Sequence, residues 1–194
     1  WWTLRRFHEA MPDAPITLVL HEGLFDDFAS LESTYGAAGV ERVVPGGAER
    51  FHSVKAGLAH LPNEGLVGIH DAVRPFPSVD TIRRCFDEAG VHGSAIPVVP
   101  LKDSIRQVES ERNAAVPREQ LRAVQTPQCF DLALLQPAFE VDYRPDFTDD
   151  ASVMEHAGHS IHLCEGDPWN VKVTTPEDLV ITRAFLRDSG ATSA

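Results

Sequence analysis

The stretch LVGIHDAVRP, residues 66–75, places an aspartate and an arginine directly after an apolar run. The run predicts a strand buried on both faces, so Asp71 would stand just past its carboxyl end, where open parallel sheets bind ligands. Asp71 has no cation beside it in the sequence, and its hard oxygen atoms suit a Mg²⁺ ion that carries substrate phosphates. Arg74 could fork onto phosphate or carboxylate oxygens. The structural alternative is that Asp71 forms a cap or turn and that Arg74 pairs with it.

Two further segments contain residue types that could hold a nucleotide or a phosphate. In PGGAERFHS (45–53), Gly46 and Gly47 separate a predicted strand from a predicted helix, so the backbone could approach a base or phosphate closely, with Ser53 nearby. A plain turn explains the same glycines, because the spacing of a dinucleotide fingerprint or a P-loop is absent. Lys172 lies in a predicted short apolar strand, so its charge must meet either an anion or the solvent.

The elements that must position these residues alternate between strands and helices. Such alternation is typical of a mostly parallel sheet covered by helices on both faces, and it predicts a doubly wound α/β fold. Thr148 and Thr175 are predicted helix N-caps. The predicted strands are 15–21, 41–44, 66–70, 93–99 and 159–166, and the predicted helices include the opening segment, 52–61, one containing Val79 to Phe86, 131–139, and those that start at Thr148 and Thr175.

Residues 102–128 interrupt this alternation. The segment is charged, has no helical stripe of apolar residues and contains only short apolar pairs, which suit thin strands. A projecting β arm that packs against another subunit explains this composition better than a core element does. We therefore predict a homodimer formed through the arm.

Composition limits the classes of protein to which the chain can belong. With 194 residues, 43% of them hydrophobic, it can bury one core, which predicts a single domain over 1–194. A formal charge of −12 argues against nucleic acid or an anionic membrane surface as a partner, since both require clustered Lys and Arg. No run of the sequence is long and apolar enough to cross a bilayer. The odd, widely spaced cysteines favour a reducing compartment, and we predict the bacterial cytoplasm, with a plastid also open.

Six motifs occur together and in one order between residues 46 and 179: GGAERFHSV, HDAVRP, PLKDSI, QTPQCF, TDDASVMEHAG and NVKVTTPEDL. In this combination the chain resembles the cytidylyltransferases that act on 2-C-methyl-D-erythritol 4-phosphate in the non-mevalonate route to isoprenoid precursors. The resemblance implies a nucleotidyltransferase-type sheet with a β arm that exchanges contacts across a homodimer. It also implies that the acceptor phosphate attacks the α-phosphorus of CTP in line and releases pyrophosphate, with no protein nucleophile.

The resemblance also implies a role for each residue that matches a family motif. Asp71 would help to hold Mg²⁺ and the nucleotide, and Lys172 would orient the acceptor phosphate for attack. Arg118, from the arm, would position the phosphate bound to the neighbouring subunit, and Arg74 would support the turn at Asp71 and contact substrate. The nucleotide pocket would comprise Asp71 with Gly46, Gly47, Ala48, Ser53 and Ala72, and the acceptor pocket Ser104, Thr126 and Thr148 with Arg74, Arg118 and Lys172.

The sequence departs from the family pattern in two respects. In the family, a glycine-rich loop with an arginine and a lysine that stabilise the triphosphate precedes the position of Trp1, as does the first strand of the sheet. From this chain alone we expect no catalysis, because most of the charge stabilisation would be absent; the lack of an initial methionine favours an incomplete sequence. Ala48 stands where some members carry an acid or a threonine, and Ser104 where some carry threonine, but a backbone contact and a hydroxyl remain.

Two other functions stay open at this point. A cytidylyltransferase of the same superfamily that acts on ribitol 5-phosphate would share the nucleotide half and differ around the sugar phosphate. The segments PREQLRAVQTPQ and FTDDAS favour methylerythritol phosphate without settling the acceptor. The other possibility, from a different class, is a non-catalytic nucleotide-binding or dimerisation module that has lost its loop.

Overall fold

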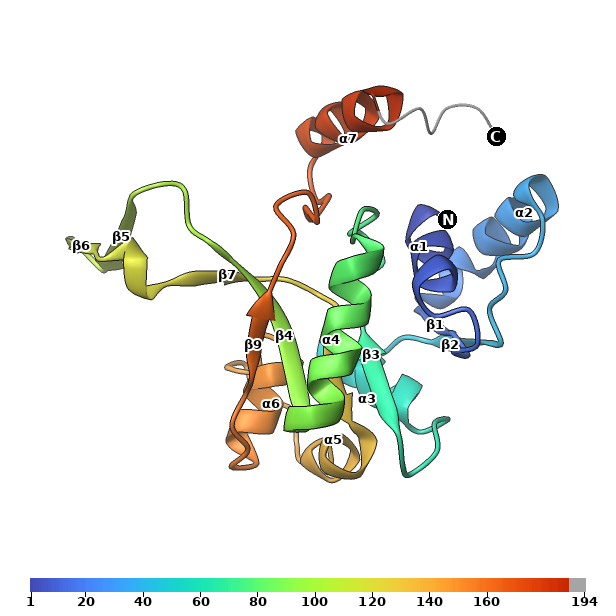
Figure 1. The fold of residues 1–194 in the computed structure, drawn as a ribbon, viewed down its shortest axis with the longest axis horizontal. Coiled ribbons are helices and arrows are strands. Elements are labelled where there is room, and N and C mark those ends of the chain that lie inside the picture. The colour runs from blue at the N-terminus through green and yellow to red at the C-terminus, as the bar shows by residue number, and fades with distance from the viewer. Residues whose placement is uncertain (189–194) are drawn as a thin grey trace.

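The computed structural model describes residues 1–188, so the polar tail expected after Ser189 lies outside the described residues. The strands fall into three ladders, of which the largest has the order β3-β8-β4-β7 with β9 also paired to β4 (Figure 1). The strands are β1 (Thr17–Leu20), β2 (Arg42–Pro45), β3 (Leu66–Ile69), β4 (Ser94–Pro100), β5 (Ile105–Glu109), β6 (Arg112–Val116), β7 (Arg122–Val124), β8 (Gln128–Asp131) and β9 (Leu163–Glu165).

The directions of the strands define a mixed sheet. β1 pairs with β2 in parallel, and β4 with β9 in parallel. β8 runs antiparallel to both β3 and β4, so β3, β4 and β9 share one direction. Each of the strands predicted at 15–21, 41–44, 66–70, 93–99 and 159–166 forms, although the last is reduced to the three residues of β9. β8 did not stand out in the sequence, because four residues are too few to show a period.

Seven α-helices in the described part of the chain accompany these strands, and two of them show clear capping. α4 begins after Ser78, whose hydroxyl accepts a hydrogen bond from the Thr81 N–H, and ends at Gly93 in the left-handed conformation. α6 begins after Asp149 rather than after the predicted cap Thr148, because Asp149 and Ser152 form a reciprocal capping box. The helices are α1 (Trp2–Ala10), α2 (Phe25–Tyr35), α3 (Arg50–Leu58), α4 (Val79–His92), α5 (Leu132–Ala138), α6 (Asp150–His156) and α7 (Pro176–Asp188).

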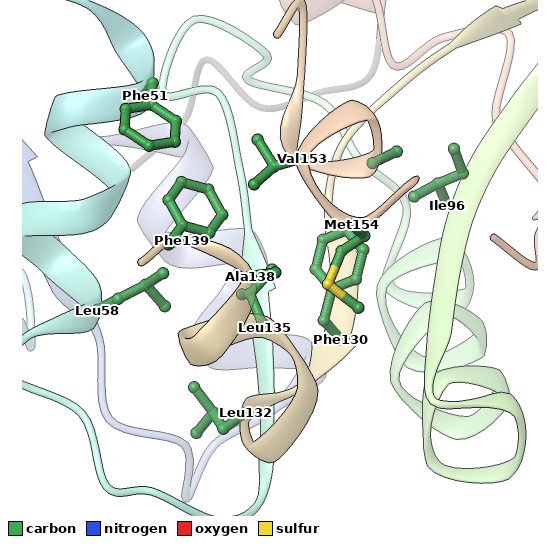
Figure 2. Packing of buried hydrophobic residues seen from close by; sticks show 11 residues of the cluster. Phe51, Leu58, Ile96, Phe130, Leu132, Leu135, Ala138, Phe139, Val153 and Met154 are labelled. Atoms are coloured by element: carbon green, nitrogen blue, oxygen red, sulfur yellow. The ribbon is translucent and has the colours of Figure 1, made fainter. Parts of the chain in front are cut away.

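Alternate residues of the central strands pack against helices on opposite faces of the sheet. In β8, Cys129 joins the buried cluster of α4, whereas Phe130 joins the cluster of α3, α5 and α6. Figure 2 shows the second cluster, in which the rings of Phe51 and Phe139 lie together and Met154 covers Phe130. The rings of Phe51 and Phe139 stack with centroids 5.0 Å apart. The two clusters explain why helices cover both faces of the sheet, as the alternation of elements predicts.

A cavity of about 730 Å³ separates β1 from β3. All four residues of each strand line it, together with apolar side chains from α1, α2 and α3. In the described residues β1 pairs only with β2, and β3 only with β8, so each strand has a free edge. The prediction that β3 is buried on both faces is therefore wrong: Leu66 is 40% exposed because its strand borders this cavity.

The hairpin formed by β5 and β6 extends away from the remaining elements (Figure 1). We call residues 105–116 the hairpin. Its side chains are mostly exposed, and Val108 is 69% exposed. No helix within residues 1–188 is long and apolar enough to span a membrane.

Candidate functional site

Three cations surround Asp71 at the carboxyl end of β3. Its Oδ1 lies 3.4 Å from Nε of Arg50, and its Oδ2 lies 3.4 Å from Nε of Arg74 and 3.2 Å from Nζ of Lys172. Arg74 lies three residues along the chain, as the alternative of a pair with Asp71 expected, whereas folding brings Arg50 and Lys172 from distant segments. Burial alone would raise the pKa of Asp71, but Arg50, Lys172 and Arg74 outweigh it and hold that pKa below its ordinary value.

Arg50, which the sequence analysis did not select, makes the best-formed ion pair of the site. Its NH1 and NH2 groups donate to the two carboxylate oxygens of buried Asp150 at 2.9 and 2.6 Å. Arg50 begins α3 and Asp150 begins α6, so the pair joins two elements whose residues are 100 positions apart. We call Arg50, Asp71, Arg74, Asp150 and Lys172 the charge cluster.

Lys172 reaches the cluster from the segment between β9 and α7. The strand predicted around Lys172 does not form. The backbone hydrogen bond nearest to Lys172 that joins this segment to another is the one from the Val173 N–H to the carbonyl of Val73. The two outcomes foreseen for its charge were an anion and the solvent, and the structure shows both: Nζ contacts Asp71 while the side chain stays 46% exposed.

Arg74 is built into the wall of the site. Besides contacting Asp71, it donates to the carbonyls of Asn170 and Val124 at 2.9 and 3.4 Å. Its backbone N–H closes a turn onto the carbonyl of Asp71 at 2.9 Å. Arg74 therefore supports the turn at Asp71, as the resemblance implies.

A buried network fixes the backbone of Asp71. Its N–H donates to Oγ1 of Thr126 at 3.1 Å, and Thr126 Oγ1 lies 3.0 Å from Nδ1 of His70. Because Nε2 of His70 faces the carbonyl of Arg74 at 3.0 Å, that nitrogen carries the hydrogen and Nδ1 accepts from the Thr126 hydroxyl. Burial lowers the pKa of His70 to about 4, so the ring is neutral near pH 7. The Thr126 hydroxyl is thereby used inside the protein.

The glycine loop lies between β2 and α3. Gly46 N–H donates to the carbonyl of Leu20 at 2.7 Å, and Gly47 N–H to Oγ of Ser53 at 3.1 Å. A Cβ on Gly47 would lie 2.3 Å from Cβ of His52, so the close approach of the loop to α3 requires glycine. Ala48 is exposed beside it. The turn interpretation is correct as far as the chain itself shows, and it leaves an exposed loop edge.

The remaining predicted residues are described by their exposure and their hydrogen-bond partners. Ala72 is exposed, and its carbonyl accepts from the Thr3 hydroxyl at 3.0 Å. Thr148 is exposed just before α6. Arg118 and exposed Ser104 flank the hairpin; Arg118 donates to the carbonyl of Lys102, and no hydrogen bond or ion pair found in residues 1–188 links either residue to Asp71.

The donors available for a divalent cation are few. Within residues 1–188 no group of three His, Cys, Asp or Glu side chains could hold a metal ion. Asp150 is committed to Arg50, which leaves Asp71 as the carboxylate of the site that is partly exposed. One carboxylate fits a Mg²⁺ ion that keeps most of its ligands from substrate phosphates and water, and it does not fit a cage made by protein alone.

The residues at this edge of the sheet are of the types that can neutralise and place phosphates. Fixed cations surround one carboxylate at the carboxyl end of β3, and a glycine loop and the N-terminus of α3 lie beside them. An α/β sheet with such a site is the arrangement of a nucleotidyltransferase.

Comparison with known proteins identifies the family. The model of the family "2-C-methyl-D-erythritol 4-phosphate cytidylyltransferase" matches residues 2–188. The chain belongs to this family. It is 43% identical over 184 residues to the 2-C-methyl-D-erythritol 4-phosphate cytidylyltransferase of Bacteroides fragilis, covering 95% of this chain and 84% of that protein. With the protein of the same description from Halalkalibacterium halodurans it shares 40% identity over 176 residues, covering 89% of this chain and 77% of that one.

Solved structures agree in fold. The 2-C-methyl-D-erythritol 4-phosphate cytidylyltransferase of Thermus thermophilus superposes with a TM-score of 0.78 at 32% identity, covering 95% of this chain and 89% of that chain. The 4-diphosphocytidyl-2C-methyl-D-erythritol synthase of Anaerococcus prevotii gives a TM-score of 0.84 at 26% identity, covering 96% and 84%. The predicted nucleotidyltransferase-type α/β fold is confirmed.

Proposed function

We propose that this chain carries the transfer of CMP from CTP to 2-C-methyl-D-erythritol 4-phosphate, giving 4-diphosphocytidyl-2-C-methyl-D-erythritol and pyrophosphate. The observation that supports this most strongly is the convergence of Arg50, Arg74 and Lys172 on Asp71 at the carboxyl end of β3. In-line attack of one phosphate on another needs no protein nucleophile, and its barrier falls when the reacting groups are held in place and their charge is neutralised.

The cations of the charge cluster differ in side-chain exposure, and this difference suggests a separate role for each. Lys172 is 46% exposed, against 35% for Arg50 and 12% for Arg74, so Lys172 is the one best placed to meet an incoming acceptor phosphate. Asp71 would hold a Mg²⁺ ion carried by CTP, and such an ion neutralises phosphate charge when it is bound. The edge of the glycine loop, with Gly46, Gly47, Ala48 and Ser53, would line the nucleotide pocket next to Ala72.

The phosphate-holding segment that the resemblance places upstream of Trp1 has a matching space in this fold. The cavity of about 730 Å³ is apolar and lies between the free edges of β1 and β3. A strand laid between those edges would pair with both and bury their apolar side chains. We propose that the upstream strand occupies this cavity, which would deliver the following loop to the charge cluster.

The hairpin supports a homodimer in which each subunit completes the other's site. Arg118 and Ser104 flank an exposed ladder and have no described link to the cluster of their own chain. We propose that they reach the acceptor of the neighbouring subunit, where Thr126 and Thr148 shape the pocket. A bacterial cytoplasm is the proposed location.

A turnover assay tests the function. The protein, expressed from its full reading frame, is given CTP, Mg²⁺ and either 2-C-methyl-D-erythritol 4-phosphate or ribitol 5-phosphate, and pyrophosphate release is followed. Lys172→Ala should lower kcat/KM by roughly 10²–10³-fold, as removal of a charge-stabilising donor does elsewhere, while exposed Arg42→Ala should not. Faster turnover with ribitol 5-phosphate would reassign the acceptor, and no turnover with either would favour a binding module.

A second assay tests the shared site. Dimers mixed from Arg118→Ala and Lys172→Ala subunits should regain part of the activity that each variant lacks, because one of the two sites then has both residues intact. If a dimer verified to be mixed recovers no activity, Arg118 does not act in the site of the neighbouring subunit.

A further inference from the structure

We propose that Arg50 is a positioning residue that fixes the glycine loop, Asp71 and the start of α6 relative to one another. The inference rests on the proposed function, since these three parts would hold the nucleotide, the metal ion and the acceptor. Arg50 would take no chemical part in the reaction and would transfer no proton.

The first argument is the place of Arg50 in the chain. It is the first residue of α3 and directly follows the glycine loop, in which Ser53 also holds Gly47. The backbone of Arg50 therefore joins the loop to α3, and the contacts of its side chain act at this junction. The guanidinium points across the site to Asp150, so the loop is tied to α6 by two charge-assisted hydrogen bonds at 2.9 and 2.6 Å.

The second argument is that the partner is immobile. Asp150 is buried, and Oε1 of Gln128 accepts hydrogen bonds from the N–H groups of Asp150 and Ala151, both at 3.1 Å. Nε2 of Gln128 donates to Asp149 at 2.8 Å. Gln128 is itself buried in β8, so the start of α6 is attached to the central sheet. Arg50 is thereby held by the sheet rather than by another surface side chain.

The third argument is the link to Asp71. With both terminal nitrogens on Asp150, Nε of Arg50 still faces Oδ1 of Asp71 at 3.4 Å, opposite the side on which Arg74 and Lys172 approach Oδ2. A planar guanidinium can make the fork and the third contact at once, whereas an ammonium group cannot.

The kinetic test compares Arg50→Lys with Arg144→Lys. Arg144 forks onto Asp146 at 2.9 and 2.8 Å on the surface, so the control loses the same geometry away from the site. Arg50→Lys should lower kcat/KM by about tenfold for both CTP and the acceptor, since misplacement of reacting groups affects both. Arg144→Lys should stay within about twofold. Equal behaviour of the two variants would overturn the proposal, and so would a loss confined to CTP, which would make Arg50 a nucleotide contact.

A readout independent of turnover keeps the inference separate from the proposed function. Amide hydrogen exchange is measured by NMR at the N–H groups of Gly47, Asp71 and Asp150, each of which donates a hydrogen bond within the chain. Arg50→Lys should speed exchange at these three groups several-fold, because the contacts that fix their segments are lost, and Arg144→Lys should leave their exchange unchanged. Unchanged exchange in Arg50→Lys would contradict the positioning role. Absence of wild-type turnover would instead count against the proposed function alone.

Discussion

The charge cluster contains predicted site residues and the hairpin is flanked by two more, Ser104 and Arg118, yet these two parts of the molecule are built in opposite ways. The cluster collects Arg50, Asp71, Asp150 and Lys172 from segments far apart in the chain, and each is held by contacts within the chain. The hairpin is held by pairing between adjacent strands and by local contacts such as that of Arg106 with Asn113. In the proposed site, one half is preorganised within a single chain and the other half is supplied by a second chain.

The same difference appears in the ion pairs of the two regions. In the cluster, Asp150 is buried and Arg50 satisfies both of its oxygens, so losing either partner leaves a charge without its pair. Near the hairpin, Arg118 and Glu119 approach only to 3.9 Å and both are exposed. Exposed pairs of this kind contribute little to stability, which leaves Arg118 available for a ligand.

The largest difference between the two regions is expected in the free energy of unfolding when one apolar side chain is truncated in each. Phe130 in β8 is fully buried between α5 and α6, and Phe130→Ala should lower the free energy of unfolding by about 3–5 kcal/mol. Val108→Ala in the hairpin should change it by less than about 0.5 kcal/mol at low protein concentration, where the chain is monomeric. Urea denaturation of both variants measures this. A loss above about 2 kcal/mol for Val108→Ala would show that the hairpin is covered within one chain.

The buried His70 should make the cluster region sensitive to acid. Its pKa is lowered from 6.5 to about 4 by burial, so the unfolded chain binds a proton between those values and the folded chain does not. Stability from this group is complete above pH 6.5 and falls as the pH drops toward 4, by up to about 3 kcal/mol. No histidine lies in residues 102–128, so the hairpin does not share this dependence.

The pH dependence can be assigned to His70 by substitution. His70→Asn should flatten the decline in the free energy of unfolding between pH 7 and pH 4.5, whereas the variant of exposed His60, His60→Asn, should keep the wild-type slope. Chemical denaturation at several pH values provides the measurement. Parallel curves for wild type and His70→Asn would show that another group carries the effect.

Two glycine substitutions, one in the glycine loop and one in α4, should change stability in opposite directions, and only the first should weaken CTP binding. Gly47→Ala would place a methyl group 2.3 Å from Cβ of His52, and such overpacking costs about 1–3 kcal/mol and should weaken CTP binding. Gly90→Ala lies inside α4, where the new methyl meets Leu66 at an ordinary 3.5 Å, so it should stabilise the protein by about 1 kcal/mol. Thermal unfolding and CTP titration of both variants test this. Tighter CTP binding by Gly47→Ala would contradict the packing argument.

The smallest effect on the folded monomer is expected from a charge on the hairpin. Val108→Asp replaces an apolar side chain that is 69% exposed, so the monomer should remain folded. If the hairpin forms the dimer, the variant should elute as a monomer at concentrations at which the wild type is a dimer. Light scattering during size-exclusion chromatography measures the molar mass of both proteins. A dimer of unchanged mass in Val108→Asp would show that the hairpin does not form the interface.

Prediction from sequence succeeded where the signal is local. The alternation of strands and helices, the hydrogen bond of Thr175 to the Asp178 N–H and the position of Asp71 after β3 all depend on residues a few positions apart. The cap of α6 was misassigned by one residue, because Thr148 and Asp149 are both good caps and only the reciprocal bond with Ser152 distinguishes them. α2 was not predicted, since none of its residues is buried and its apolar pattern is weak.

The sequence by itself determined the family, the order of the elements and the segments in which site residues lie, because motifs and periodicity are properties of neighbouring residues. Only the tertiary structure decided that Arg50 pairs with Asp150, that three cations meet at Asp71, and that the Thr126 hydroxyl is used by His70. Apart from that of Arg74 with Asp71, these contacts join segments roughly twenty to a hundred residues apart. Their formation depends on how the two clusters of the core pack the helices against the sheet, and no local pattern encodes that packing.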